Sequence, residues 1–156
     1  MTGELEGAIA LPDGTAIRGR GRRDGMPSGP EPDFGLYLFR RPGTHRKLLR
    51  TTVAEWEPSW AADWVDWPDF RMPRDGRAAA ASIAAAFGRA RAGERVEVVC
   101  DGGTGRTGTV IACMAVLAGH PAAEALAWTR THYRRRAVET PGQKRWIGWF
   151  AAHLRA

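Results

Sequence analysis

The fold is decided by residues 96–108, which read Val-Glu-Val-Val-Cys-Asp-Gly-Gly-Thr-Gly-Arg-Thr-Gly. Residues 96–100 are rich in β-branched side chains, as is typical of a strand buried inside an α/β sheet. A glycine-rich turn follows, and residues 106–118 then form a predicted helix that ends at Gly119. Strand, tight turn and helix in succession predict an α/β fold with a central, mostly parallel sheet flanked by helices.

The turn between this strand and helix is suited to hold an anion. Its glycines let the backbone curl so that successive N–H groups point inward, and the helix N-terminus adds unpaired amides and a positive dipole end. A thiol at Cys100 is expected to ionise readily there, because the helix N-terminus and a neighbouring arginine both stabilise a thiolate. Arg106 offers a planar fork that can hold two oxygens of a phosphate.

Other interpretations share these residues. The spacing Gly103-x-Gly105-x-x-Gly108 also fits the dinucleotide-binding fingerprint, but that motif needs a second parallel strand with an acidic residue after the helix. Here another helix follows Pro121, and Glu124, the nearest suitable acid, falls on it. A Walker-type loop is excluded because no lysine precedes the threonine and the glycine spacing differs. The remaining alternative is a core cysteine before an ordinary turn.

A second motif, Trp67-Pro68-Asp69-Phe70, lies upstream of Cys100. Cleavage of a phosphate ester needs a proton donor on the side of the leaving group, opposite the nucleophile. Asp69 can supply that proton. A Pro-Asp turn beside a core tryptophan is the structural alternative. The catalytic interpretation is favoured because a Cys-x5-Arg loop follows this motif in the sequence.

Together the two motifs resemble those of the protein tyrosine phosphatase superfamily. The loop is similar to its phosphate-binding pattern Cys-x-x-Gly-x-Gly-Arg-Thr-Gly, and residues 67–70 resemble its mobile Trp-Pro-Asp loop. Because the acid precedes the cysteine, the order resembles the classical and dual-specificity branches rather than the low-molecular-weight enzymes. The short length is similar to compact bacterial enzymes of that type.

The resemblance implies a role for each matching residue. Cys100 is expected to attack phosphorus and form a cysteinyl phosphate, and Asp69 to protonate the leaving group. Thr107 is expected to assist departure of the sulfur in the second step. The phosphate is expected to be held by Arg106 together with the backbone amides of Asp101, Gly102, Gly103, Thr104 and Gly105.

The segment Glu139-Thr140-Pro141-Gly142-Gln143 carries a third, weaker match. The resemblance implies that Gln143 orients the water that hydrolyses the phosphoenzyme. Thr140 and Gln143 also form a Thr-x-x-Gln capping box, which gives the glutamine a structural use at its own helix start. Both roles stay open on the sequence alone.

Two residues next to Cys100 are unfavourable for a thiolate at that position. Val99 stands where histidine is common, which removes a hydrogen-bonding group beneath the loop. Asp101 places a negative charge next to the nucleophile. Farther along, residues 134–136 are three arginines that are expected to form a solvated helix end. A binding site is the alternative, because they lie just before the Gln143 segment, where substrate could pass.

The other expected elements surround these motifs. Asp13-Gly14 predicts a hairpin turn, and Asp75 is a candidate helix N-cap. Strands are expected at 35–39 and 64–67, helices at 76–92, 121–135 and from 140 onward, and an exposed loop at 40–50. The chain is expected to form a single phosphatase domain, 1–156, in which 1–50 supply a hairpin and loops and 64–150 carry the catalytic core motifs.

Composition limits cofactors and location. A hydrophobic content of 44% and seven tryptophans exclude disorder. The four histidines and two cysteines have no metal-ligand spacing, so no metal and no cofactor are expected, and Cys113 is expected in the core. There is no secretory signal, and the nearly uncharged run 78–87 is half the length of a membrane span. These features predict a cytoplasmic protein without membrane contact.

The net charge of +6 favours an anionic partner. The expected substrate is a protein phosphorylated on tyrosine, or also on serine and threonine. The alternatives are a small phosphorylated metabolite or nucleotide, and a phosphate-binding pseudophosphatase, which would be expected to lack the cysteine, arginine or aspartate. Nucleic acid is not expected, because no readout motif and no alternating basic and aromatic strand is present.

Overall fold

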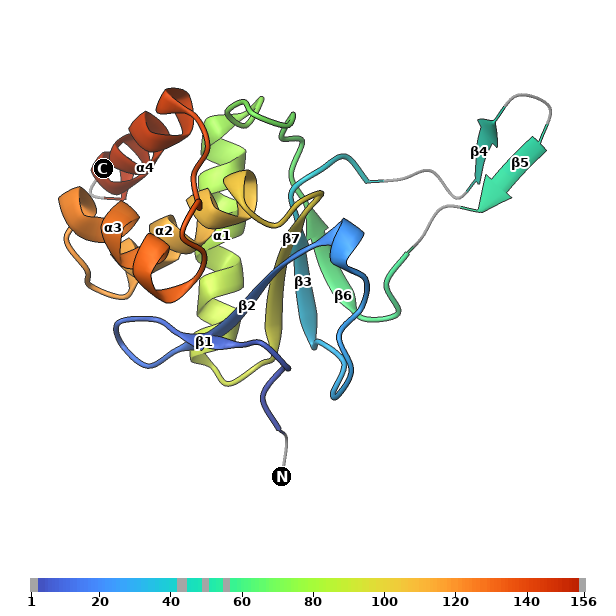
Figure 1. The fold of residues 1–156 in the computed structure, drawn as a ribbon, viewed down its shortest axis with the longest axis horizontal. Helices are drawn as coiled ribbons and strands as arrows, with labels where there is room; N and C mark the ends of the chain where they lie inside the picture. The colour runs from blue at the N-terminus through green and yellow to red at the C-terminus, as the bar shows by residue number, and fades with distance from the viewer. Residues whose placement is uncertain (1–2, 42–44, 49–50, 55–56, 155–156) are drawn as a thin grey trace.

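The computed structural model describes residues 3–41, 45–48, 51–54 and 57–154. A five-stranded sheet forms its centre, with the strand order β1-β2-β7-β3-β6 (Figure 1). β2, β7, β3 and β6 run parallel to one another, and β1 pairs antiparallel with β2. The strands are β1 (Ile9–Ala10), β2 (Ala16–Gly21), β3 (Phe34–Tyr37), β6 (Ala61–Trp64) and β7 (Val96–Cys100). The predicted α/β class with a mostly parallel sheet is confirmed.

The α-helices of the described chain gather on one side of the sheet (Figure 1). α1 and α2 pack directly against the strands, and α3 and α4 pack against α2. Because neighbouring elements surround it, α2 is buried along its first eleven residues. The helices are α1 (Gly76–Arg91), α2 (Gly105–Leu117), α3 (Ala122–His132) and α4 (Pro141–His153), and a 3-10 turn, η1, spans Arg22–Asp24.

Local sequence explains where these helices begin and end. The Asp75 side chain accepts a hydrogen bond from the Ala78 N–H at the start of α1, and Gly93 follows that helix with a φ of 97°. The Thr140 hydroxyl accepts from the Gln143 N–H at the start of α4. Each cap satisfies an amide that the helix leaves open and contributes about 1 kcal/mol. Both predicted starts are confirmed.

Several predicted boundaries were wrong. The strand expected at 35–39 is β3, which covers 34–37. β6 covers 61–64 rather than 64–67, because its partner β3 ends at Tyr37 and the chain then turns away to form the segment that carries Asp69. α3 ends at His132 rather than near 135. The predicted loop at 40–50 contains a strand, β4 (His45–Leu48), which pairs antiparallel with β5 (Thr51–Ala54) as a separate two-stranded sheet. The β-branched run Thr51-Thr52-Val53 favours that strand, and 42–44 and 49–50 lie outside the described residues.

The sheet face away from the helices buries an ionic cluster. Glu97 of β7 alternates with valines that face the helices, so its side chain lies on the opposite face, fully buried. Its carboxylate accepts hydrogen bonds from Arg18 at 2.7 Å, from Arg20 at 2.8 and 3.0 Å, and from the Tyr37 hydroxyl at 2.9 Å. Burial opposes ionisation of Glu97, but the hydrogen bond and charge of Arg20 and the hydrogen bonds of Arg18 and Tyr37 lower its pKa below the ordinary value. These contacts join β2, β7 and β3.

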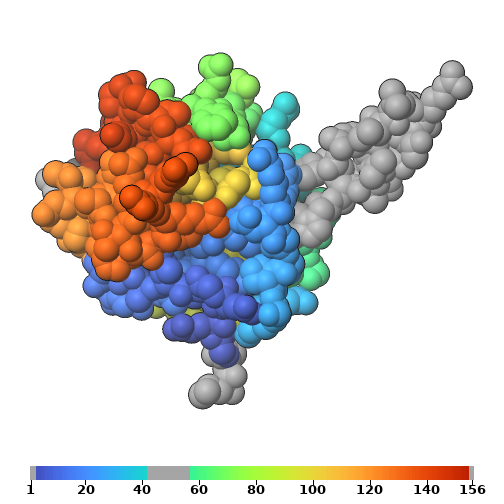
Figure 2. All heavy atoms as spheres, in the orientation of Figure 1, coloured from blue at the N-terminus to red at the C-terminus, as the bar shows by residue number. Residues whose placement is uncertain are grey.

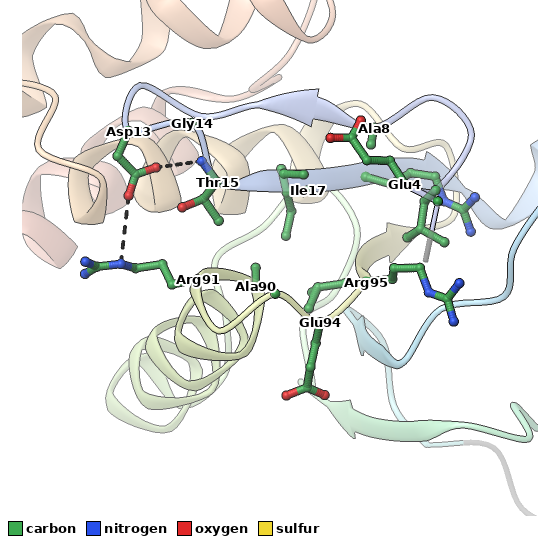
Figure 3. A pocket seen from close by; sticks show the side chains of 16 residues that line it. Glu4, Ala8, Asp13, Gly14, Thr15, Ile17, Ala90, Arg91, Glu94 and Arg95 are labelled. Atoms are coloured by element: carbon green, nitrogen blue, oxygen red, sulfur yellow. Dashed lines mark hydrogen bonds and ion pairs between the residues drawn. The ribbon is translucent and has the colours of Figure 1, made fainter. Parts of the chain in front are cut away.

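A cavity of about 420 Å³ lies at the amino ends of β2 and β7 (Figure 3). Asp13 on its rim accepts a hydrogen bond from the Thr15 N–H at 2.9 Å and lies 4.0 Å from the Arg91 guanidinium. Cys100 ends β7 at the opposite edge of the sheet, so this cavity is separate from the predicted site. Among the described residues, no helix is both long and apolar enough to cross a membrane.

Candidate active site

The Cys100 loop, residues 100–106, joins the end of β7 to the start of α2. Gly103 has a φ of 76°, and a Cβ there would lie 2.4 Å from the Gly21 backbone nitrogen. Only glycine allows this left-handed turn so close to β2. The turn brings the Gly103 nitrogen to 3.1 Å from the Cys100 sulfur, to which its N–H donates. Cys100 is 2% exposed. The local sequence therefore folds a backbone amide onto the candidate nucleophile.

Arg106 extends from the first turn of α2 and is 3% exposed. Its Nη1 donates to the carbonyl oxygens of Leu38 at 2.9 Å and Trp67 at 2.8 Å. Its Nη2 lies 3.3 Å from the Asp101 carboxylate and 3.5 Å from the Asp69 carboxylate, and its buried Nε has no hydrogen-bond partner in the described chain. Nη1 is thus fixed by carbonyls and Nη2 bonds Asp101, while Nε is open, so an anion can bind at the Nε–Nη2 edge by sharing Nη2 with that carboxylate.

Asp101 places its negative charge between two arginines. Its carboxylate accepts hydrogen bonds from Arg22 and Arg106, and its carbonyl oxygen accepts from the Arg23 N–H at 3.1 Å. Partial burial opposes ionisation, but the bond and charge of Arg22 and the charge of Arg106 hold the pKa of Asp101 below its ordinary value. The charge beside the nucleophile is therefore compensated locally.

The acid loop, residues 67–73, brings Asp69 to Arg106. Trp67 anchors the loop, because its ring is buried against Trp146 and its indole N–H donates to the Arg71 carbonyl at 2.6 Å. Asp69 has a side chain that is 40% exposed and accepts from the Phe70 N–H at 3.0 Å. Phe70 is exposed and has a φ of 59°, a left-handed conformation that bulky residues adopt at a cost. The loop thus presents a carboxylate beside an exposed ring.

Two side chains that follow α3 form hydrogen bonds with the Cys100 loop. The Tyr133 hydroxyl donates to the Gly103 carbonyl, and Arg134 donates to the Gly102 carbonyl at 2.7 Å and the Thr104 hydroxyl at 3.2 Å. Arg134 also bonds Asp24 at 3.1 Å. Since the peptide group is planar, carbonyls that point toward these donors leave the N–H groups of the same peptides directed the other way.

Arg22, Tyr133 and Arg134 were missed by the sequence analysis. The prediction that residues 134–136 form a solvated helix end is wrong for Arg134, which contacts the loop. No local pattern marks these residues, because their contacts with the loop arise only from the tertiary fold. Figure 2 shows the loop region (yellow) at the surface between the acid-loop region (green), the segment after α3 (orange) and the η1 region (blue).

Thr107 and Gln143 are both fully buried. The Thr107 hydroxyl has no hydrogen-bond partner in the described part of the chain, so its predicted assistance to the sulfur stays a prediction. The Gln143 side chain bonds backbone at both ends: its Oε1 accepts from the Glu139 N–H at 2.9 Å, and its Nε2 donates to the Arg71 carbonyl at 3.3 Å. These contacts support the capping alternative and give no support to water orientation by Gln143 itself.

Two further predictions concern apolar neighbours. Val99 packs with Tyr37 and Phe39 on the sheet face away from the helices, so no side chain from this position reaches the loop. Cys113 lies in the core, as expected, and burial raises the pKa of its thiol. Within the described ranges, no group of three or more histidine, cysteine, aspartate or glutamate side chains could hold a metal ion.

Comparisons with known proteins identify the family of this chain. The sequence pattern of the protein-tyrosine phosphatase family matches residues 46–140. The chain therefore belongs to the protein-tyrosine phosphatase family. No curated protein matches the sequence significantly.

Solved structures share the fold at low sequence identity. Tk-PTP in its active form matches with a TM-score of 0.66 and 22% identity, covering 94% of this chain and 97% of that chain. Human DUSP28 matches with a TM-score of 0.65 and 16% identity, covering 95% and 97%. PTPMT1 in complex with PI(5)P matches with a TM-score of 0.55 and 16% identity, covering 78% of each chain.

Proposed function

We propose that this chain hydrolyses phosphotyrosine in proteins, and phosphoserine or phosphothreonine as well, through a cysteinyl-phosphate intermediate. The observation that carries the proposal is the placement of Arg106. It presents the Nε–Nη2 edge of its guanidinium from the N-terminus of a buried helix, with Asp69 at 3.5 Å and the Cys100 loop before it. An anion held there is expected to lie near both the Cys100 sulfur and the Asp69 carboxylate.

In the first step, the Cys100 thiolate attacks phosphorus. An S–P bond forms and the P–O bond to the leaving group breaks, while Asp69 transfers its proton to the departing oxygen. Arg106 and the loop amides stabilise the charge on the non-bridging oxygens as it develops. The Nη1 bonds to two carbonyls keep the guanidinium in place, so little reorganisation is needed during the reaction.

In the second step, water attacks the cysteinyl phosphate. An O–P bond forms, the S–P bond breaks, and the electron pair returns to the sulfur as thiolate. Asp69, now ionised, takes one proton from the water. The buried Thr107 hydroxyl, which has no hydrogen-bond partner among the described residues, donates to the sulfur as it leaves. The Gly103 N–H at 3.1 Å stabilises the same thiolate.

The exposed Phe70 beside Asp69 supports a phosphotyrosine substrate. Phe70 is 59% exposed and forms part of the acid loop. An aromatic ring can pack against it, and such pairs contribute about 0.5–1.5 kcal/mol beyond their buried area. A serine or threonine side chain offers no such surface.

The test is hydrolysis of an aryl phosphate without added metal. Wild type is expected to be active, and Cys100→Ser inactive. Asp69→Ala is expected to lose about 10²- to 10⁴-fold with an alkyl phosphate and much less with a nitrophenyl phosphate, whose leaving group needs no proton. Full activity in Cys100→Ser would contradict the mechanism. Phosphopeptides compared with nucleotides and sugar phosphates then define the substrate, and exclusive turnover of the small compounds would contradict the protein substrate.

A further inference from the structure

The segment before α4 holds a strained residue next to the Cys100 loop. Val138 has a φ of 68°, which is a genuine outlier for a β-branched side chain, and it is buried. Arg130 holds the segment through bonds from Nε to the Ala137 carbonyl and from Nη2 to the Val138 carbonyl, each 2.9 Å. The Val138 N–H donates to the Thr104 carbonyl at 3.3 Å. Such strain persists only where surrounding contacts impose it, and it gathers at functional sites.

The strain sets the position of the next residue, Glu139. A Cβ added to Gly105 would lie 2.1 Å from Glu139 Oε1, so glycine at 105 is what leaves room for this carboxylate. Gly105 is both a member of the Cys100 loop and the first residue of α2. The Glu139 side chain is exposed and forms no hydrogen bond or ion pair with any residue that the structure describes. A solvent-accessible carboxylate without a partner therefore lies against the loop.

The buried amide of Gln143 joins this segment to the acid loop. Its Oε1 accepts from the Glu139 N–H, and its Nε2 donates to the Arg71 carbonyl. The Trp67 indole bonds the same Arg71 carbonyl, and the Trp67 carbonyl accepts from Arg106. One connected set of hydrogen bonds thus fixes Glu139, Asp69's loop and Arg106 relative to one another.

We propose that Glu139 is a catalytic residue of the second step, a step that rests on the proposed function. Its carboxylate accepts a hydrogen bond from the water that attacks the cysteinyl phosphate, while Asp69 takes the other proton of that water. The water oxygen bonds to phosphorus, and the S–P electron pair returns to Cys100. Gln143 is a positioning residue that sets the spacing of the two carboxylates. A charged acceptor makes a stronger bond to water than a neutral amide does.

A purely structural role for Glu139 predicts something different. Acidic side chains near a helix N-terminus stabilise the helix dipole by about 0.3–1 kcal/mol. Loss of that contribution would lower the midpoint of thermal unfolding of the protein. It would not change which chemical step limits turnover, so step-resolved kinetics separate the two roles.

The experiment compares wild type, Glu139→Ala and Glu139→Gln in rapid mixing with a nitrophenyl phosphate, followed by acid quench to measure cysteinyl phosphate. In Glu139→Ala, formation of the phosphoenzyme is expected to keep its rate. Steady-state turnover is expected to fall about tenfold to a hundredfold, as for a misplaced reacting group. The phosphoenzyme should then accumulate and produce a burst. Glu139→Gln keeps an oxygen acceptor without the charge and should recover the turnover only in part.

Glu124→Ala on α3 is the matched control, since it removes another exposed glutamate and should leave both steps unchanged. Unchanged turnover and no accumulation in Glu139→Ala would overturn the inference, as would a loss of phosphoenzyme formation in step with turnover. A wild-type protein without Cys100-dependent hydrolysis contradicts the proposed function and the inference together. An active wild type with an unaffected Glu139→Ala contradicts the inference alone.

Discussion

At the scale of single residues, two adjacent glycines in the Cys100 loop differ sharply in what a side chain would meet. Gly103 has a left-handed backbone, and a Cβ there would lie 2.4 Å from the Gly21 nitrogen and 2.6 Å from the Arg20 carbonyl carbon. Both contacts are with backbone, which cannot move aside as a flexible side chain can. Gly102 has no positive φ, and a Cβ there would meet no atom within 4 Å.

We therefore expect Gly103→Ala to lose phosphatase activity by about a hundredfold or more, because the loop amides shift from their positions. The strained conformation adds a loss of about 1–3 kcal/mol in the free energy of unfolding. Gly102→Ala is expected to stay close to wild type in both respects. Turnover of an aryl phosphate and urea unfolding check the pair, and equal losses in both variants would contradict this account.

At the scale of elements, the strand–loop–helix unit could be predicted because its signals are local. β-branched residues fill β7, glycines follow, and α2 begins where the glycines end. In the structure, Asp69 of the Trp-Pro-Asp match lies 3.5 Å from Arg106. The ends of β6 and α3 could not be predicted from local sequence. β6 ends where its partner β3 ends, and α3 ends where Tyr133 and Arg134 bond the Cys100 loop.

The contacts that hold the site together were likewise beyond local patterns. Arg22, Tyr133 and Arg134 come from η1 and from the end of α3, far along the chain from the loop that they bind. Gln143 was predicted from its match to the family, yet its side-chain amide forms hydrogen bonds with backbone groups of two loops. Glu139 could not be singled out from the sequence, because its contact with Gly105 arises only in the folded chain.

The link between the acid loop and α4 gives a prediction about stability. Gln143→Ala removes the acceptor of the Glu139 N–H and one of two donors to the Arg71 carbonyl, and leaves a buried polar group without a partner. We expect the free energy of unfolding to fall by about 1–3 kcal/mol. Urea unfolding measures it. Lys144→Ala, at the exposed next position of α4, should change it little, and an equal effect in the two variants would argue against a buried link.

At the scale of the whole molecule, the two faces of the sheet are stabilised in different ways. The face under α1 and α2 is apolar, whereas the opposite face buries Glu97 between Arg18 and Arg20. Removing one member of a buried ion pair leaves charge without compensation and costs about 3–5 kcal/mol. Glu97→Gln should therefore destabilise the fold by about that amount at pH 7 through the two arginines that it leaves buried.

The pH dependence of this loss follows from the lowered pKa of Glu97. A carboxyl group whose pKa is lower in the folded state stabilises the protein above its unfolded value, about 4.3, and this contribution is lost as pH falls through the folded pKa. The difference in unfolding free energy between wild type and Glu97→Gln should therefore be constant from about pH 5 to 7 and narrow below about pH 4. Glu94→Gln breaks a partly exposed pair with Arg89 at 3.0 Å and should cost less than about 1 kcal/mol. Urea unfolding of the three proteins across this pH range decides the matter, because a difference that does not narrow in acid would mean that the charge on Glu97 contributes nothing to joining the strands.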